Sequence, residues 1–154
     1  MFATQPYRDV CKYRVQSLLN YENKLQLDKK ETWVRFFIDI QELKEKVVRF
    51  IKGEKQKGKT FWAYCASTKG NTFLQWFGLD HTLIDGIAER NINKWGLKTV
   101  ATGISIYSED EFRKASPDYT IILAWHFVQS FLEREAEYLK TGKFIVCMPK
   151  FEIL

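Results

Sequence analysis

The chain has 154 residues, a length typical of one domain, and its 45% apolar and 28% charged residues exclude a disordered chain. Its net charge of +5 permits an anionic ligand without requiring one. The cysteines (Cys11, Cys65 and Cys147) are odd in number and widely spaced, which argues against a disulfide framework or zinc site and predicts a reducing, cytoplasmic environment. No signal-like or bilayer-length apolar run is present, so no membrane association is expected.

The first part of the chain divides into a poorly readable segment and a strong helical pattern. Residues 1–32 carry only a weak helical pattern, through Tyr7, Val10, Tyr13 and Leu18, and are interpreted as an N-terminal extension or a severed linker. Apolar residues then recur every three or four positions, which predicts a long amphipathic helix over 33–52 that packs against a folded body. Gly53 and Gly58 are expected to end it.

Strand and helix patterns alternate from residue 60 onward. Short apolar runs predict strands at 60–65, 83–88, 104–106, 118–125 and 143–148. Helices are predicted at 72–77, from a Ser108–Glu111 capping box to Pro117, and over 127–139. This alternation predicts an α/β fold, a small Rossmann-like parallel sheet flanked by helices and preceded by the long amphipathic helix, within one domain at 33–154.

The lysines at 52–59 are interpreted as a solvated helix end. No RNA-binding or zinc-finger signature occurs, so no nucleic-acid partner is expected.

In open α/β sheets, ligands bind outside the carboxyl ends of the strands, where three polar segments are expected here. The most informative is the turn 66–72, because a turn entering a helix presents free N–H groups that suit a phosphate. Lys69 adds positive charge, Gly70 would let a ligand approach the backbone, and short polar side chains surround them at Ser67, Thr68, Asn71 and Thr72. An ordinary capped helix start would explain the same residues.

The second and third segments are less specific. Arg90 and Lys94, near Asn91, could bind phosphates beside the first turn, although a solvated loop is an equally simple explanation. His126 follows a strand, where a lone histidine is commonly a capping or packing residue, and no carboxylate partner is evident. The sequence shows no Ser-His-Asp order, metal-ligand cluster or carboxylate pair, so no catalytic or metal-binding residue is predicted.

These segments together resemble the C-terminal domain of the sugar C-methyltransferases. Residues 66–72 resemble the family's A-x-x-K-G-N-T turn, and residues 89–96 resemble its D-R-N-x-x-K-x-G loop. Residues 102–106 resemble P-G-T-x-I-P-I, residues 117–127 resemble P-D-Y followed by L-A-W-N-F, and 143–149 resemble the closing strand. The resemblance covers about residues 34–150 in the same order and spacing.

The resemblance implies a function in binding substrate. Family members use S-adenosylmethionine to methylate a ring carbon of a nucleotide-linked keto-sugar, commonly a dTDP-sugar, and carry a zinc-binding region and a central cofactor-binding domain. This sequence shows neither part, so it is expected to hold no cofactor, to be catalytically incomplete alone and to work with a methyltransferase domain or subunit. The implied substrate-binding residues are Ser67, Thr68, Lys69, Gly70, Asn71, Thr72, Arg90, Asn91, Lys94, Trp125 and His126. Lys69, Arg90 and Lys94 would contact pyrophosphate, and Trp95 or Trp125 the base.

Two alternatives stay open at this point: an interaction module whose helix 33–52 docks a separate methyltransferase domain without strong ligand binding, and a free-standing enzyme acting on nucleotide-sugars.

The sequence also departs from the family pattern. Ala63 and Cys65 stand where glycine is common, Glu89 replaces aspartate, His126 replaces asparagine, and Val100-Ala101 replaces proline-glycine. Cys65 is the departure closest to the expected phosphate turn.

Overall fold

The structure is a computed structural model that describes residues 5–154, with side chains described from residue 10 onward. It divides into two compact units, residues 1–42 and 43–154, and each is described by itself. The predicted division at residue 32 stays a prediction.

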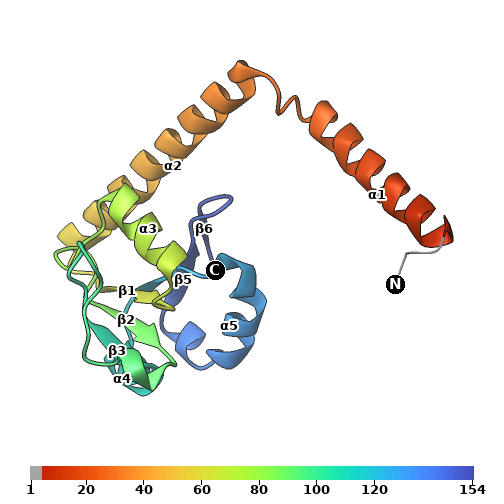
Figure 1. Ribbon diagram of the computed structural model, residues 1–154. Coiled ribbons are helices and arrows are strands. Elements are labelled where there is room, and N and C mark those ends of the chain that lie inside the picture. The colour runs from red at the N-terminus through yellow and green to blue at the C-terminus, as the bar shows by residue number, and fades with distance from the viewer. Residues whose placement is uncertain (1–4) are drawn as a thin grey trace. The chain divides into compact units, whose positions relative to one another are not determined.

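The first unit contains helix α1 (Gln5–Lys24) and the start of helix α2 (Lys30–Gln56) (Figure 1). Helix α1 is longer than the weak pattern predicted, because its straight-chain residues favour a helix and none between 7 and 24 is glycine or proline. Val10, Tyr13 and Leu18 are exposed on it, and the side chain of Tyr7 lies outside the described part.

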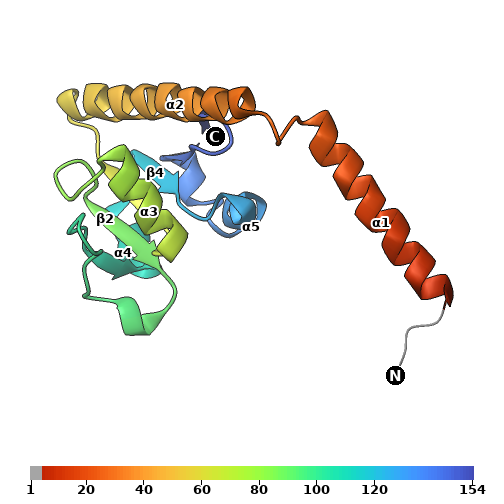
Figure 2. The same ribbon diagram turned by 45° about the horizontal axis from the view of Figure 1, so that its top comes forward.

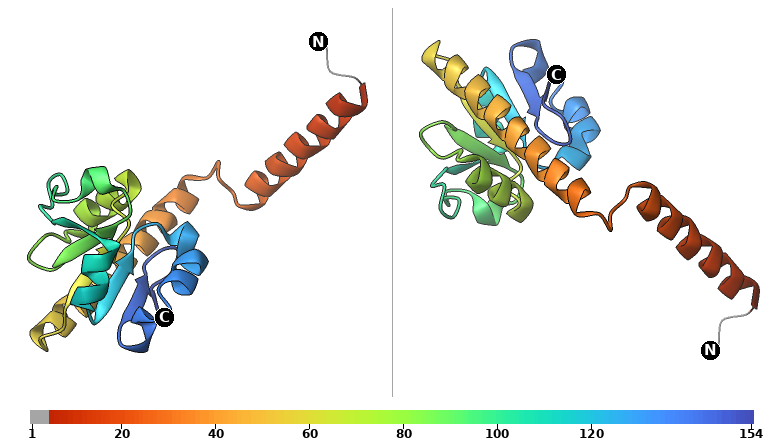
Figure 3. Two further views of the ribbon diagram at one scale, coloured as in Figure 1. Left: turned by 90° about the horizontal axis from the view of Figure 1, so that it is seen from below. Right: turned by 90° about the horizontal axis from the view of Figure 1, so that it is seen from above.

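Helix α2 contains the predicted 33–52 helix and extends it at both ends. The prediction that Gly53 ends this helix is wrong: the helix continues to Gln56, and the left-handed Gly58 (φ 81°) follows. An isolated glycine costs a helix only about 1 kcal/mol, whereas Val47 and Ile51 are fully buried and hold the second half of α2 in place. Viewed as in Figure 3 (right), this half crosses over the sheet.

The second unit is built on a six-stranded sheet with the order β3-β2-β1-β4-β5-β6. Its strands are β1 (Phe61–Tyr64), β2 (Gly86–Glu89), β3 (Ile106–Ser108), β4 (Tyr119–Ile122), β5 (Lys143–Val146) and β6 (Glu152–Ile153). The first five are parallel and β6 pairs antiparallel with β5. The predicted Rossmann-like parallel sheet with flanking helices is therefore confirmed. Strand β6 was not predicted, since a two-residue edge strand has no hydrophobic period.

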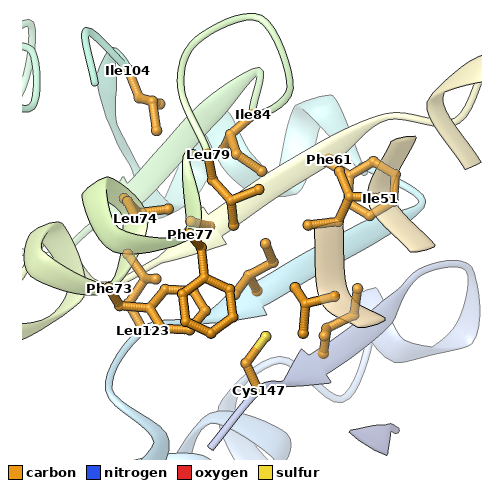
Figure 4. Packing of buried hydrophobic residues seen from close by; sticks show 14 of the residues in the cluster. Ile51, Phe61, Phe73, Leu74, Phe77, Leu79, Ile84, Ile104, Leu123 and Cys147 are labelled. Atoms are coloured by element: carbon orange, nitrogen blue, oxygen red, sulfur yellow. The ribbon is translucent and has the colours of Figure 1, made fainter. Parts of the chain in front are cut away.

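Alternate strand residues point to opposite faces, so the sheet has a hydrophobic core on each side. Helix α3 (Thr68–Phe77) and the second half of α2 cover one face, where Phe73, Phe77, Leu123 and Cys147 pack together (Figure 4). Helices α4 (Glu109–Ala115) and α5 (Val128–Arg134) cover the other face, over an aromatic core that includes Tyr64. Figure 2 shows the second half of α2 and α4 on opposite sides of the sheet.

Some predicted element boundaries were wrong. Strand β2 begins at Gly86 instead of 83, because residues 80–84 form a turn in which Asp80 accepts hydrogen bonds from Thr82. The predicted helix 127–139 is broken into a 3₁₀ turn η2 (Trp125–Phe127), helix α5 and a 3₁₀ turn η3 (Tyr138–Lys140). The helix stops where Glu135 turns its carboxylate into the core. The predicted capping box of Ser108 and Glu111 is confirmed.

Candidate functional site

The order of the strands places a crevice at the carboxyl end of β1. Strand β1 pairs with β2 on one side and with β4 on the other. The chain adds β3 beyond β2 on the first side, and β5 beyond β4 on the second, so the order of the strands reverses between β1 and β4. Such a switch point is the usual ligand site of an open α/β sheet. All three predicted segments, 66–72, 89–96 and 125–126, follow the strands at this edge.

Helix α3 begins at this edge with an N-cap formed by Ser67. The Ser67 side chain accepts a hydrogen bond from Gly70 N at 3.0 Å, which ends the preceding extended segment and starts the helix at Thr68. The predicted start at Thr72 was therefore too late, and the Thr72 hydroxyl donates instead to Thr68 O within the helix. Within the described residues, the backbone N–H groups of Thr68 and Lys69 have no acceptor, which leaves them available to an anion.

Gly70 is needed for packing, which differs from the predicted role. A Cβ atom added there would lie 2.7 Å from Leu123 Cβ and 3.0 Å from Leu123 Cδ1, so only glycine lets α3 approach the residue that follows β4. The missing side chain faces the protein interior, not a ligand.

Lys69 connects the start of α3 to the segment after β4. Its ammonium lies 5.3 Å from the centroid of the Trp125 ring, a cation–π contact, and the side chain remains exposed. His126 is exposed, and its ring contacts Phe127 with the centroids 4.3 Å apart. The structure thus brings Lys69 and Trp125 together, whereas the ring contact of His126 is with Phe127.

Glu89, at the end of β2, organises the loop that follows. Its buried carboxylate accepts hydrogen bonds from Ala66 N at 2.9 Å, Asn91 N at 2.9 Å and Lys94 Nζ at 3.2 Å. Lys94 Nζ also donates to Ala66 O at 2.8 Å, and the Trp95 indole donates to Glu89 O at 2.7 Å. Lys94, Asn91 and Trp95 therefore help to shape this loop, and the contacts of Lys94 and Trp95 with a ligand stay predictions.

Arg90, next to Glu89, is exposed and has no hydrogen-bond or ion-pair partner among residues 10–154. Of the three predicted phosphate-binding cations, Lys69 and Arg90 thus keep their charged groups available.

The backbone conformation at Cys65 is one that favours glycine. Its φ of 77° lies in the left-handed region, which glycine adopts without strain. The side chain is half-buried, and burial raises the pKa of its thiol, which therefore stays protonated at neutral pH. Cys65 therefore lines the crevice with a strained backbone and a protonated thiol.

A charged cluster on the face covered by α4 and α5 was missed by the sequence analysis. The hydroxyl oxygen of Tyr64 lies 2.8 Å from Glu109 Oε1 and 2.7 Å from Glu135 Oε1. Arg113 donates two hydrogen bonds to Glu135, through Nε at 2.9 Å and Nη2 at 2.7 Å, and Arg134 Nη2 lies 3.0 Å from Glu109 Oε1. The sequence did contain one signal for this cluster. Glu135 lies between Phe131 and Leu139 on the apolar stripe of the predicted helix, where a charged residue needs a buried partner.

Burial, with hydrogen bonds to Glu135 and Glu109, raises the pKa of Tyr64 far above its usual range. Tyr64 therefore stays protonated; its single hydroxyl proton is shared between Glu109 and Glu135, and its oxygen accepts a hydrogen bond from Arg134 Nη2.

Two pockets of similar size flank the carboxyl end of β1. The first, which we call the α5 pocket, has a volume of about 300 Å³ and is lined by Tyr64, Cys65, Ala88, Glu89, Arg90, Glu109, Phe127, Ser130, Phe131 and Arg134. The second, the α3 pocket, has about 310 Å³ and lies between α3 and residues 98–100. Arg134 lines the α5 pocket and Asn71 lines the α3 pocket. Each has one buried side-chain atom without a hydrogen bond in the structure, Arg134 Nε and Asn71 Oδ1. Unsatisfied buried groups of this kind need a partner such as water or a ligand.

Neither a metal cluster nor a membrane span occurs in the described part of the chain. Its His, Cys, Asp and Glu side chains form no group of three or more that could hold a metal ion. No helix over the same residues is long and apolar enough to cross a bilayer.

Comparison with known proteins identifies the class that this fold and crevice represent. A family model described as the C-methyltransferase C-terminal domain matches residues 2–149, and the chain belongs to this family. The chain is also similar to the C-methyltransferase NovU of Streptomyces niveus, with 28% identity over 120 residues. That match covers 77% of this chain and 29% of NovU, so the chain spans less than a third of the relative's length.

Proposed function

We propose that this chain is the substrate-binding domain of a C-methyltransferase and that it holds the diphosphate of a nucleotide-linked sugar at the start of α3. The observation that carries the proposal is the pair of free N–H groups at Thr68 and Lys69, beside the ammonium of Lys69 at the switch point of the sheet. A helix N-terminus with nearby cations favours phosphate groups. Family membership, together with the nucleotide-sugar substrates that the sequence resemblance implies, supports a dTDP-sugar as the ligand.

The remaining predicted residues have supporting functions in this proposal. Arg90 supplies a second free cation from the loop after β2, and Trp125 presents its ring beside Lys69. Lys94 and Asn91 keep that loop in position through Glu89 and the backbone. We place the protein in the cytoplasm, where its free cysteines would stay reduced.

S-adenosylmethionine does not fit this site. In Rossmann-like cofactor sites an acidic residue after the second strand accepts the ribose hydroxyls, but the Glu89 carboxylate is buried and already accepts hydrogen bonds from Ala66, Asn91 and Lys94. The crevice also presents two free cations, Lys69 and Arg90, which would repel a sulfonium ion. The methyl donor therefore belongs in another domain or subunit, and this chain contributes substrate binding.

Replacing Lys69 or Arg90 by alanine is expected to weaken the binding of a dTDP-sugar about ten- to hundredfold each, because a hydrogen bond to a charged group contributes about 1.5–3 kcal/mol. Isothermal titration calorimetry at low ionic strength would measure the change. Lys114→Ala is the matched control, since Lys114 is an exposed cation in the last turn of α4, at the end of that helix away from the crevice. A panel of dTDP-, UDP-, GDP- and CDP-sugars that gives neither heat nor a thermal shift would reject the proposal.

A second candidate function, docking of a methyltransferase domain, is favoured by the first unit. Its large apolar side chains are exposed at Val10, Tyr13, Val15, Leu18, Leu19, Tyr21, Leu25, Trp33, Val34, Phe36, Phe37 and Ile38. Exposed apolar groups of this extent mark interaction surfaces. The family model includes this region, whereas the relative is more than three times as long as the matched segment, so the occupant we propose is the cofactor-binding part of a C-methyltransferase.

The double variant Leu18→Glu, Phe36→Glu is expected to weaken docking at least tenfold, because each change places a charge in a buried apolar contact. Sedimentation velocity with a separately produced cofactor-binding domain of the same family would measure the complex. Lys12→Glu, an exposed position of α1 outside the apolar set, is the control. Docking that is equally strong for the double variant would contradict this assignment.

A further inference from the structure

We propose that His126 is a third cation of the diphosphate site at the start of α3, and that its protonation makes the ligand bind more tightly as the pH falls. The inference rests on the proposed function and adds to it a dependence on pH. Asparagine stands at this position in the family pattern that the sequence resembles, so the property distinguishes this chain from that pattern.

His126 lies between two residues at the edge of the crevice. Strand β4 is a neighbour of β1, and the chain leaves its carboxyl end through Ala124 into the 3₁₀ turn η2. In this turn the Trp125 ring carries the Lys69 ammonium on its face, and Phe127 lines the α5 pocket. Because consecutive Cα atoms are about 3.8 Å apart, the backbone of His126 is fixed directly beside that of the residue that contacts Lys69.

The imidazole of His126 has no polar partner. Its ring is exposed, contacts the Phe127 ring and forms no hydrogen bond or ion pair among residues 10–154. The sequence left open that this histidine caps a helix, but neither η2 nor α5 has a cap formed by a side chain. Both ring nitrogens are therefore available to an anion.

The charges around this edge leave a positive excess that a diphosphate would neutralise. They belong to Lys69 on α3, Glu89 and Arg90 at and after the end of β2, Glu109 on α4, and Glu133 and Arg134 on α5. Glu89 pairs with Lys94, Glu109 pairs with Arg134, and Glu133 accepts a hydrogen bond from Gln129. Lys69 and Arg90 keep charges without an ion-pair partner in the described part of the chain. The bound diphosphate is thus the counter-ion that favours a protonated imidazole at this edge.

His126 is the histidine placed to respond to the ligand. Imidazole is the side chain that ordinarily changes its charge between about pH 5 and pH 8. The chain has two histidines, and the other, His81, follows the carboxyl end of α3, whereas the diphosphate site lies at its amino end. The pKa of the Cys65 thiol in the crevice is raised by burial, so this group stays protonated over the same range. A ligand that favours the protonated form of His126 is itself bound more tightly when His126 is protonated.

The test measures the affinity of the whole chain for dTDP-glucose by calorimetry at low ionic strength, from about pH 8 to about pH 5.5. Both ends of the diphosphate of this probe are esterified, whereas a terminal phosphate would itself titrate near about pH 6. We expect the affinity to rise about fivefold over the range, the effect of one exposed ion pair. Binding at about pH 6.5 should also take up protons, measured as a difference in heat between buffers of different ionisation enthalpy.

Variants of the two histidines separate the proposed effect from other sources of pH dependence. His126→Asn should bind like the unmodified chain at about pH 8 and gain no affinity at lower pH. His126→Arg, with a permanent charge, should bind about fivefold more tightly at about pH 8 and show no pH dependence. His81→Asn is the matched control and should keep the full pH dependence, because His81 is also exposed and its Nδ1 lies 3.4 Å from Thr102 O. Circular dichroism establishes that each variant is folded at both ends of the range.

Three outcomes overturn the inference while the diphosphate site stands. They are an affinity of the unmodified chain that does not change with pH, a pH dependence that His126→Asn retains, and a pH dependence that His81→Asn removes. In each case Lys69→Ala still weakens the binding of dTDP-glucose. If dTDP-glucose does not bind the unmodified chain at any pH of the range, the inference and the proposed function are both rejected.

Discussion

Replacement of Glu135 by alanine is expected to lower the free energy of unfolding by about 1–3 kcal/mol, the usual cost of leaving buried hydrogen-bonding groups without their partner. The carboxylate is buried and accepts two hydrogen bonds from Arg113, and the Tyr64 hydroxyl lies 2.7 Å away. Without it, the Arg113 side chain keeps only its exposed contacts with Glu109 and Asp110. Urea denaturation followed by circular dichroism would measure the loss.

The neighbouring Glu133 provides the control for this prediction. Glu133 is exposed on α5 and accepts one hydrogen bond from Gln129, so Glu133→Ala should change the stability by no more than about 0.5 kcal/mol. Glu135→Gln, which keeps the shape of the side chain, should fall between the two. Equal stabilities of Glu135→Ala and Glu133→Ala would show that the cluster does not hold α4 and α5 together.

Gly70→Ala is expected to destabilise the fold by about 1–3 kcal/mol, the cost of overpacking a filled core, and also to weaken ligand binding. The added methyl group would lie 2.7 Å from Leu123 Cβ, so α3 must move away from the end of β4. That movement displaces the free N–H groups of Thr68 and Lys69 at the start of the same helix. Thermal unfolding and calorimetric titration of a dTDP-sugar would measure the two effects.

Gly53→Ala is the matched control, because Gly53 lies inside α2 with no atom within 4 Å of an added Cβ. Alanine there should stabilise the protein by about 0.5–1 kcal/mol through its higher helix propensity and should leave ligand binding unchanged. If Gly70→Ala were as stable as the unmodified chain, the close approach of α3 to Leu123 would not be needed.

The sequence was sufficient to predict the features that depend on local patterns. The uniform apolar runs around Phe61–Tyr64 and Tyr119–Ile122 predicted parallel strands, and the Ser108–Glu111 spacing predicted a capping box, because both signals lie within a few residues of one another. The alternation of these elements then predicted the arrangement that brings segments 66–72, 89–96 and 125–126 to one edge.

Side-chain partnerships across the fold could not be predicted in the same way. The atoms of Tyr64 and Glu135 that meet in the core belong to residues 71 positions apart, and no local spacing indicates their contact. The contact of Lys94 with Glu89 could not be predicted either: the charge of Lys94 is visible in the sequence, but its partner becomes evident only when the loop folds back onto Ala66. Gly70 was assigned to ligand approach because its close packing against Leu123, 53 residues away in the sequence, forms only in the folded domain.

The Glu89 carboxylate binds Ala66 in the turn after β1 and Asn91 and Lys94 in the loop after β2, so it joins the two segments that frame the crevice. Fixing the backbone of a free loop costs about 1–2 kcal/mol per residue in conformational entropy. Because the link forms as the domain folds, that cost is met before a ligand arrives and is not subtracted from its affinity. The crevice is in this sense a preorganised site, in which ligand binding orders side chains and leaves the backbone as it is.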